Sequence, residues 1–497
     1  MAGDLLENEE FDVVVLGTGP IEALVASELA DQGRRVLHIE RSPHYGGHYA
    51  SLTPSALLDW ASSLSTARDR RLVPRVELYC GDAASGEESR LQLEAAEDAE
   101  QARMALAGLL ENDRGYALEL APRLVRCRGK AIDTLVGAGV GEYLQFRGVD
   151  GNYIITGGSQ PVARRVPESK EDVFAASWLS LIEKRKLMRL LGALNTASSS
   201  DDDGDGSKRD ASFASVLAAR PYALEGPILD ALVYGVARQG RNRVLTAAEG
   251  FDAVRRYVGA MGRYGRMAYL GALHGGCSEV AQAFCRLCAV SGGTYILDER
   301  PVLSSPVGEE STRRFDIQLR NGSARARSVI MDPTYAPEAT ASADPAATVS
   351  RALCVLDAAP FGDDSTALLT YVADGRAVSL LYMTHATMAV PSGQSVVYAW
   401  TEGRLDDERA LLVEALNSVL SSSSSSSSTN QELAGNTTSA CRPLMTVLFE
   451  VCTLLPHAEA SSSPPGIIYT DGPSSTDIDF DSIIDSAQKA LSAIQPS

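Results

Sequence analysis

The chain has 497 residues, of which 45 are lysine or arginine and 64 are aspartate or glutamate, so its formal charge is −19. This charge argues against non-specific binding to nucleic acid or anionic lipid, because both are negatively charged themselves. Apolar residues make up 45% and no run reaches about eighteen of them, which predicts a soluble globular protein without a membrane-spanning helix. The eight scattered cysteines are typical of reduced thiols and indicate the cytosol.

The chain opens with a pattern of strand, tight turn and helix. Residues 11–16 (FDVVVL) form a largely β-branched run, typical of a strand buried on both faces. The glycine turn at 17–19 follows, and residues 21–32 predict a helix that ends before a glycine. Residues 35–39 predict a second buried strand. This βαβ unit is typical of the nucleotide-binding half of a doubly wound fold.

Helical patterns dominate residues 171–237, apart from a polar interruption at 198–206 that predicts a loop. Another polar insertion is expected at 85–108, and a serine-rich loop near 418–440. Later strands and a final helix are expected at 328–331, 352–356, 379–383, 395–400 and 482–494.

These elements predict an α/β protein with an FAD/NAD(P)-binding-like core and an inserted, mainly helical domain. The core would be discontinuous, formed by residues 1–130 and 236–497. Residues 131–235 would form the helical domain.

Gly17 and Gly19, with Glu40 at the end of the second strand, supply most of a dinucleotide-binding fingerprint, in which the acid would hold a ribose. The third glycine of the fingerprint is replaced by Glu22. A carboxylate adds bulk there, and its charge repels pyrophosphate by roughly 4 kcal/mol per charge pair at about 4 Å. We therefore predict that the site holds no cofactor, with an FAD-dependent oxidase as the alternative class.

Several longer motifs lie in order along the first two thirds of the chain. They are the opening segment 11–47, EYLQFR at 142–147, IEKRKLMRLL at 182–191, GRYG at 262–265, SEVAQAFCRLCAVSGGTY at 278–295 and MDPTY at 331–335. Together they resemble the Rab GDP-dissociation-inhibitor and Rab escort protein superfamily, whose members also carry glutamate at the third fingerprint position.

The resemblance implies a GDI-type fold, in which the core binds the GTPase domain of a GDP-bound Rab and the helical domain holds geranylgeranyl lipid. It also implies a Rab-binding surface. Its residues would be Tyr45 before the glycine pair at 46–47, and Arg263 and Tyr269 in a mobile loop. Glu279, Gln282 and Arg286 on one helix face and Tyr295 would complete it. An ordinary pairing of Glu279 with Arg286 within the helix is the alternative at these positions.

A second set of residues separates the two branches of the superfamily. If residues 174–194 form one helix, four side chains fall within about 60° of one another. This set, called the stripe below, is Phe174, Trp178, Leu181 and Arg185. Ile182 would lie on the opposite, core-facing side. An aromatic–arginine stripe is typical of a binding hot spot, whereas a fully buried helix, or two helices broken near Ser177, is the alternative. In the escort branch the resemblance implies that Phe174 and Arg185 contact the α/β heterodimer of Rab geranylgeranyltransferase.

Residues 467–491 resemble the acidic segment and last helix of the escort branch. We therefore predict a non-enzymatic accessory protein that binds newly made GDP-bound Rab GTPases and presents them to the transferase. It would then shelter the lipids of prenylated Rab until a transient membrane contact, with no nucleic-acid partner. Burying a C20 chain is worth more than roughly 10 kcal/mol, so an apolar site is required. A GDP-dissociation inhibitor is the alternative.

A zinc site is the remaining candidate. Cys285 and Cys288 lie three residues apart, with Cys277 and His274 upstream, but no second ligand pair has the spacing of a closed site. We expect these cysteines to be core residues and the chain to hold no metal.

Overall fold

The structure is a computed structural model that describes residues 7–64, 73, 75–80, 90–91, 104, 106–158, 161–196, 211–304, 314–336, 347–421, 441–453, 466–471 and 476–494. In these residues no helix has the length and apolar character needed to cross a membrane. The loop expected at 198–206 lies outside the described residues, as does most of the insertion expected at 85–108. Of the serine-rich loop expected near 418–440, residues 418–421 belong to a helix instead, and the remainder lies outside the described residues.

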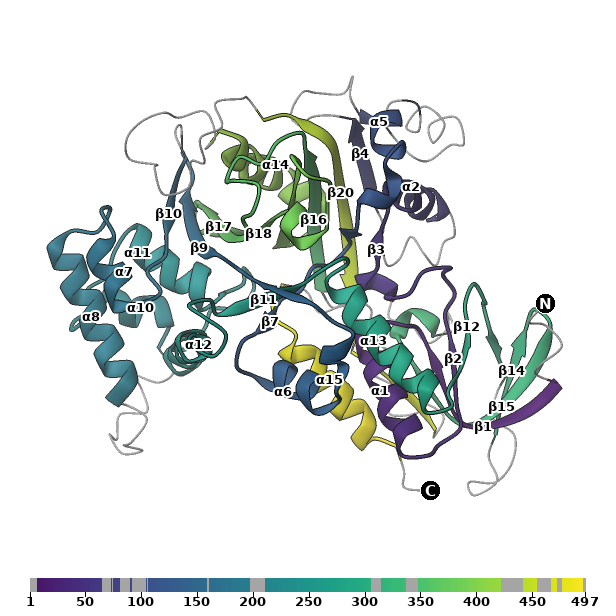
Figure 1. Cartoon of the computed structure of the whole chain (residues 1–497). Coiled ribbons are helices and arrows are strands. Elements are labelled where there is room, and N and C mark those ends of the chain that lie inside the picture. Colours follow the sequence, from purple (N-terminus) through teal and green to yellow (C-terminus); the bar gives the residue numbers. More distant parts are fainter. Residues whose placement is uncertain are drawn as a thin grey trace.

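Two large sheets organise the chain (Figure 1). The first has the strand order β12-β2-β1-β15-β14-β13, with β21 also paired to β15. Its strands are β1 (Glu7–Leu16), β2 (Val36–Ile39), β12 (Thr294–Ile296), β13 (Val302–Leu303), β14 (Phe315–Leu319), β15 (Gly322–Met331) and β21 (Ile467–Tyr469). The strands β12, β2, β1, β15 and β21 run parallel, and β1 is wholly buried at Val13, Val14 and Val15. The predicted βαβ start is therefore confirmed.

Three helices cover one face of the first sheet. Helix α1 (Pro20–Asp31) follows the glycine turn and packs against α13 (Cys277–Val290) and α15 (Asp481–Ser492). Helix α15 also packs against α6 (Lys130–Gly137). The predicted terminal helix is confirmed, and it returns the end of the chain to the first helix.

The second sheet has the order β10-β9-β17-β18-β19-β16-β20-β4-β5 and is antiparallel except between β9 and β17. Its strands are β4 (Val76–Cys80), β5 (Arg90–Leu91), β9 (Gly151–Thr156), β10 (Val162–Arg165), β16 (Ala347–Leu356), β17 (Ala367–Ala373), β18 (Arg376–Thr384), β19 (Ser395–Glu402) and β20 (Pro443–Thr453). Helix α14 (Leu405–Ser421) packs against its central strands. The strands expected at 352–356, 379–383 and 395–400 are confirmed.

Helices gather at one end of the molecule, beside β9 and β10 (Figure 1). They are α7 (Lys170–Ala175), α8 (Leu181–Thr196), α10 (Phe213–Ala218), α11 (Pro227–Asp230), the π-helical turn η5 (Ala231–Val236) and α12 (Ala247–Ala260). We call this group the helical layer. It spans most of the predicted helical insertion, while β9 and β10 from the same stretch extend the second sheet. The domain boundaries themselves stay a prediction.

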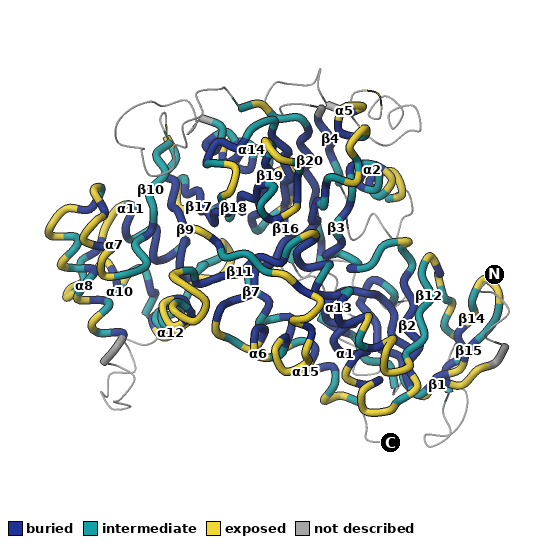
Figure 2. Tube along the Cα trace, viewed as in Figure 1, coloured by how far each residue is buried: buried dark blue, intermediate teal, exposed yellow. Residues whose placement is uncertain are grey.

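Short elements connect these layers. They are η1 (Gly47–Tyr49), β3 (Ser51–Leu52), α2 (Pro54–Ser63), α5 (Ala107–Leu110), η3 (Asp113–Gly115), β6 (Leu118–Glu119), β7 (Val125–Arg126), η4 (Val140–Glu142), β8 (Phe146–Gly148), β11 (Tyr269–Ala272), η6 (Pro333–Tyr335) and η8 (His385–Thr387). Buried residues run through both sheets, whereas exposed residues concentrate on the outer helices (Figure 2).

Candidate functional site

The glycine turn between β1 and α1 lies beneath a tyrosine ring. Gly17 has φ +105°, a conformation that side-chain-bearing residues rarely adopt. A Cβ atom at Gly17 would lie 3.4 Å from a ring carbon of Tyr335, which belongs to the turn η6 after β15. The fingerprint turn is therefore present, but Tyr335 occupies the space next to it.

Glu22 folds back from the first turn of α1 toward the same loop. A Cβ atom at Gly19 would lie 2.5 Å from Glu22 Oε2, and the Thr470 hydroxyl donates to Glu22 Oε1 at 2.5 Å. Burial first, and then the nearby carboxylate of Asp332, raise the pKa of Glu22 from 4.5 to about 8. Glu22 is thus protonated at neutral pH. The raised pKa weakens the expected charge repulsion, whereas the bulk of Glu22 and its hydrogen bond with Thr470 fill the space beside the loop.

Glu40, the expected ribose ligand, is held by protein donors. Its Oε2 accepts from the backbone N–H and the hydroxyl of Thr18 at 2.7 and 2.8 Å. Its Oε1 accepts from the Ser42 N–H at 3.0 Å and the Tyr335 hydroxyl at 3.1 Å. The Arg41 guanidinium lies 4.7 Å from the centre of the Tyr335 ring. The acid is therefore saturated by its own chain.

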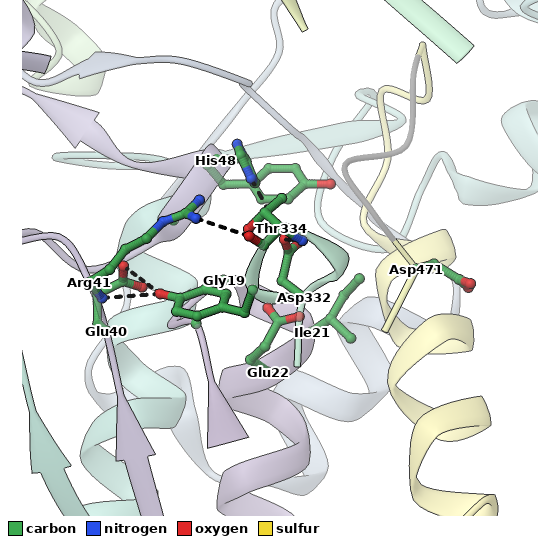
Figure 3. Close-up of a pocket in the computed structure, with 13 residues that line it drawn as sticks. Gly19, Ile21, Glu22, Glu40, Arg41, His48, Asp332, Thr334 and Asp471 are labelled. Carbon is green, nitrogen blue, oxygen red and sulfur yellow. Dashed lines mark hydrogen bonds and ion pairs between the residues drawn. The ribbon is translucent and has the colours of Figure 1, made fainter. Parts of the chain in front are cut away.

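The space beside the glycine turn is small. The cavity among Gly17, Gly19, Glu22, Asp332 and Tyr335 measures about 20 Å³ (Figure 3). That volume is enough for about one water molecule. Putting a pyrophosphate there would require both Glu22 and Tyr335 to move, with loss of the hydrogen bonds of Glu22 and Glu40.

The predicted Rab-binding helix is α13, whose outer face carries all three expected side chains. Gln282 donates from Nε2 to Glu279 Oε1 at 3.1 Å, and the half-buried carboxyl of Glu279 has a raised pKa because of desolvation. Arg286 is exposed and lies over the ring of Tyr143, 4.4 Å from its centre. Arg286 therefore pairs with an aromatic ring on η4–β8 rather than with Glu279.

Tyr45 and Tyr295 lie next to this face. Their ring centres are 6.3 Å apart, and the Tyr45 carbonyl accepts from Ser278 of α13 at 3.4 Å. The Tyr295 hydroxyl lies 3.0 Å from Nδ1 of His38, whose Nε2 lies 2.5 Å from the Gly17 carbonyl. Burial lowers the pKa of His38 to about 4, so the ring is neutral; Nε2 donates to the carbonyl and Nδ1 accepts from Tyr295. This chain joins the expected Rab-binding residues to the glycine turn.

Arg263 and Tyr269, the other two residues expected to bind Rab, lie in different kinds of structure. Arg263 is exposed in the loop after α12, and its Nη1 donates to Asp133 of α6 at 3.0 Å. Tyr269 is only 5% exposed and lies in strand β11, beside Tyr257. Its predicted position in a mobile loop is therefore wrong, because β11 pairs with both β7 and β8.

The predicted single helix over residues 174–194 is wrong, because the chain breaks between α7 and α8. Ser180 caps α8 in a reciprocal pair with Glu183: the Ser180 N–H donates to the carboxylate and the Glu183 N–H to the Ser180 hydroxyl. The break near Ser177, which was the alternative, is the one observed.

The stripe is nevertheless largely on the surface. Phe174 is 67% exposed, Leu181 is 76% exposed and Arg185 is exposed. Trp178 is half-buried and donates from its indole N–H to the Arg165 carbonyl at 3.1 Å, so it supports the break between the helices. Ile182 is 65% exposed, and its predicted place in the core is therefore wrong.

The start of α15 and the residues just before it are tied to β7 and α6. Asp479 and Asp481 both form ion pairs with Arg126, and Asp481 also accepts from the backbone N–H of Ala131 in α6.

Three residues near these surfaces were not predicted from the sequence: Thr470, Tyr143 and Tyr335. Tyr143 lies in the motif EYLQFR and Tyr335 in the motif MDPTY. Their place in motifs that resemble the superfamily was the signal that could have identified both tyrosines.

The cysteines of the candidate zinc site are packed into the core. Cys277, Cys285 and Cys288 are buried and free, and no group of three metal-ligating side chains occurs within the described ranges. Burial raises the pKa of the Cys285 thiol to about 12, which disfavours the thiolate that a metal needs.

Comparisons with known proteins agree with this architecture. The family model described as GDP dissociation inhibitor matches residues 7–71 and 64–370. The chain is 25% identical to "Rab proteins geranylgeranyltransferase component A" of Drosophila melanogaster over 98% of this chain and 89% of the relative. It is 25% identical to "Rab escort protein 1" of Arabidopsis thaliana over 88% and 85%.

The sequence alignment with an inhibitor covers a smaller share of the chain. "Rab GDP dissociation inhibitor beta" of Canis lupus familiaris is 26% identical over 70% of this chain and 68% of its own length. The solved structure of Rab GDI from Plasmodium falciparum superposes with a TM-score of 0.68 at 15% identity, over 98% of both chains. The predicted GDI-type α/β fold is thus confirmed. Since the family model spans well over half of the chain, this protein belongs to the GDP dissociation inhibitor family.

Proposed function

We propose that this chain is a Rab escort protein, a non-enzymatic accessory component of Rab geranylgeranyltransferase. Membership of the GDP dissociation inhibitor family supports Rab GTPases as its partners. Two relatives, one named as component A of the geranylgeranyltransferase and one as Rab escort protein 1, align with 98% and 88% of the chain, against 70% for an inhibitor. The observation that carries the proposal is the exposed stripe on the helical layer, at a distance from a second surface on α13.

In this proposal, the GDP form of Rab binds the face made by α13 and the neighbouring tyrosines. Arg286 and Tyr143 offer a cation stacked on an aromatic ring, and Arg and Tyr are enriched among residues that dominate binding energy. Arg263 adds an exposed guanidinium beside α6. Preference for GDP follows if this surface recognises the relaxed switch segments of the GTPase, because those segments are ordered by the γ-phosphate.

The transferase heterodimer would bind the stripe on α7 and α8. Phe174 is 67% exposed on α7, and Lys184 donates to its carbonyl oxygen at 2.7 Å, which fixes the end of that helix relative to α8. Leu181 and Arg185 are one turn apart on α8. The aromatic residue and the arginine are therefore held by two rigid elements, as a preorganised contact requires.

The test is lipid transfer from geranylgeranyl diphosphate to an unprenylated Rab by purified transferase heterodimer. The full chain should support transfer, and Phe174→Ala should abolish recruitment of the transferase while Rab binding is kept. Val302→Ala, at a residue 65% exposed on β13, is the matched control and should behave as wild type. Rab binding without any support of transfer would point to the inhibitor function, which the similarity to Rab GDP dissociation inhibitor beta keeps as the second candidate.

We further propose that the fingerprint loop binds no flavin and that the protein is cytosolic, with transient membrane contact during delivery of prenylated Rab. The small cavity and the saturated Glu40 support the first point. A visible absorption spectrum of the purified chain tests it: stoichiometric flavin would instead favour an oxidase.

A further inference from the structure

The N-terminal end of α8 combines exposed apolar side chains with a local excess of positive charge. Phe174, Leu181 and Ile182 are 67%, 76% and 65% exposed. Apolar side chains this exposed, gathered at one place, mark a surface that binds something. Ile182 is not one of the stripe residues, so the apolar patch is larger than the proposed transferase contact.

The geometry of α8 puts cations on the same side. At 100° per residue, Leu181, Arg185, Arg189 and Ile182 fall within about 100° of one another. The opposite side carries Leu187, Leu190 and Leu194, which are buried. The helix therefore presents two aliphatic residues and two arginines outward.

The charge of this helix is opposite to that of the whole chain. Helix α8 carries four basic residues and one acid, whereas the chain as a whole has a charge of −19. Lys184 and Arg189 donate to the carbonyl oxygens of Phe174 and Pro221, at 2.7 and 2.8 Å. Carbonyl oxygens are neutral, so these two contacts do not themselves cancel the positive charges of the side chains.

Acids also lie near the apolar residues: Glu171 of α7 is exposed, and Glu183 of α8 accepts from the Ser180 N–H at 2.7 Å. Lys186 lies 3.9 Å from Glu225, and Asp172 of α7 is paired with Arg266 at 2.8 Å. Four aspartates stand at 201–205, outside the described residues, after the end of α8. Leu181 and Ile182 lie at its N-terminal end, about 20 Å from Thr196 at a rise of about 1.5 Å per residue.

We propose that this face of α7 and α8 binds the surface of an anionic lipid bilayer, with Phe174, Leu181 and Ile182 at the boundary between headgroups and acyl chains. Exposed apolar residues flanked by arginine and lysine are the composition of interfacial helices. Each cation near an anionic surface strengthens binding by about fivefold, which lets a local patch overcome the negative charge of the remainder. Since Leu181 and Arg185 also belong to the stripe, the bilayer and the transferase compete for one face.

The experiment is flotation of the full chain, without Rab or transferase, on vesicles of phosphatidylcholine alone or with roughly one third phosphatidylserine. Wild type should float with the anionic vesicles only, and Ile182→Asp should lower the bound fraction by about fivefold or more. Val302→Asp, an exposed aliphatic residue on the first sheet, is the control and should leave flotation unchanged. Thermal unfolding should be the same for both variants, because both side chains are mainly exposed.

Arg189→Gln provides a second variant with a milder change, and it should lower flotation and weaken its dependence on salt. Equal flotation on neutral and anionic vesicles, unchanged flotation of both α8 variants, or no flotation at all would overturn the proposal. None of these outcomes depends on prenylation, so failure here leaves the lipid-transfer assay as a separate test of the proposed function.

Discussion

Glu22→Gln should stabilise the protein, and the gain should grow as the pH rises. Burial raises the pKa of Glu22 from 4.5 to about 8, so between these values the folded chain binds a proton there that the unfolded chain has released. The free energy of unfolding of wild type therefore falls as the pH rises across this range. At 1.36 kcal/mol per pH unit, the loss is about 3 kcal/mol at pH 7 and below about 1 kcal/mol at pH 5.

Glutamine keeps the shape of the protonated acid and does not titrate. Urea unfolding of wild type and Glu22→Gln should thus differ by about 3 kcal/mol at pH 7 and by little at pH 5. Glu28→Gln is the matched control, since Glu28 lies on the same helix and is exposed. A gain of equal size at both pH values, or none at pH 7, would refute the assignment of a protonated Glu22.

Three further outcomes are expected. Arg286→Ala should weaken Rab binding by about tenfold in a titration, since it removes a side chain stacked on an aromatic ring, with unchanged unfolding temperature. Thr470→Val should lower the free energy of unfolding by about 1–2 kcal/mol, because buried Glu22 loses its donor. Leu190→Ala should cost about 2–5 kcal/mol, since Leu190 is wholly buried, whereas Phe174→Ala should change stability by less than about 0.5 kcal/mol.

Local patterns predicted the parallel core well. The β-branched run of β1 and the glycine turn after it both need particular residue types, so the βαβ start was visible in the sequence. Helix α15 was equally visible from its apolar spacing. Local patterns could not predict that Tyr335 lies over Gly17. The two residues are 318 positions apart in the chain, and their contact depends on how β15 pairs with β1.

The same distinction applies to the functional surfaces. The motifs identified Glu279, Gln282 and Arg286 on one face of α13, and the structure places them there. Periodicity failed around Ser177, because the Ser180–Glu183 cap starts a new helix and rotates the residues that follow. Ile182 therefore faces outward, and the sequence pattern alone could not distinguish this from a continuous helix.

Strand β21 and helix α15 have a consequence for synthesis of the chain. The first sheet needs β21 beside β15, and Glu22 needs Thr470, yet β21 and Thr470 are synthesised long after α1 and β15. Until α15 is synthesised, the amino-terminal half exposes the surface of α1 that α15 later covers. A nonsense codon just before Ile467 should therefore yield an aggregation-prone product rather than a slightly shortened one.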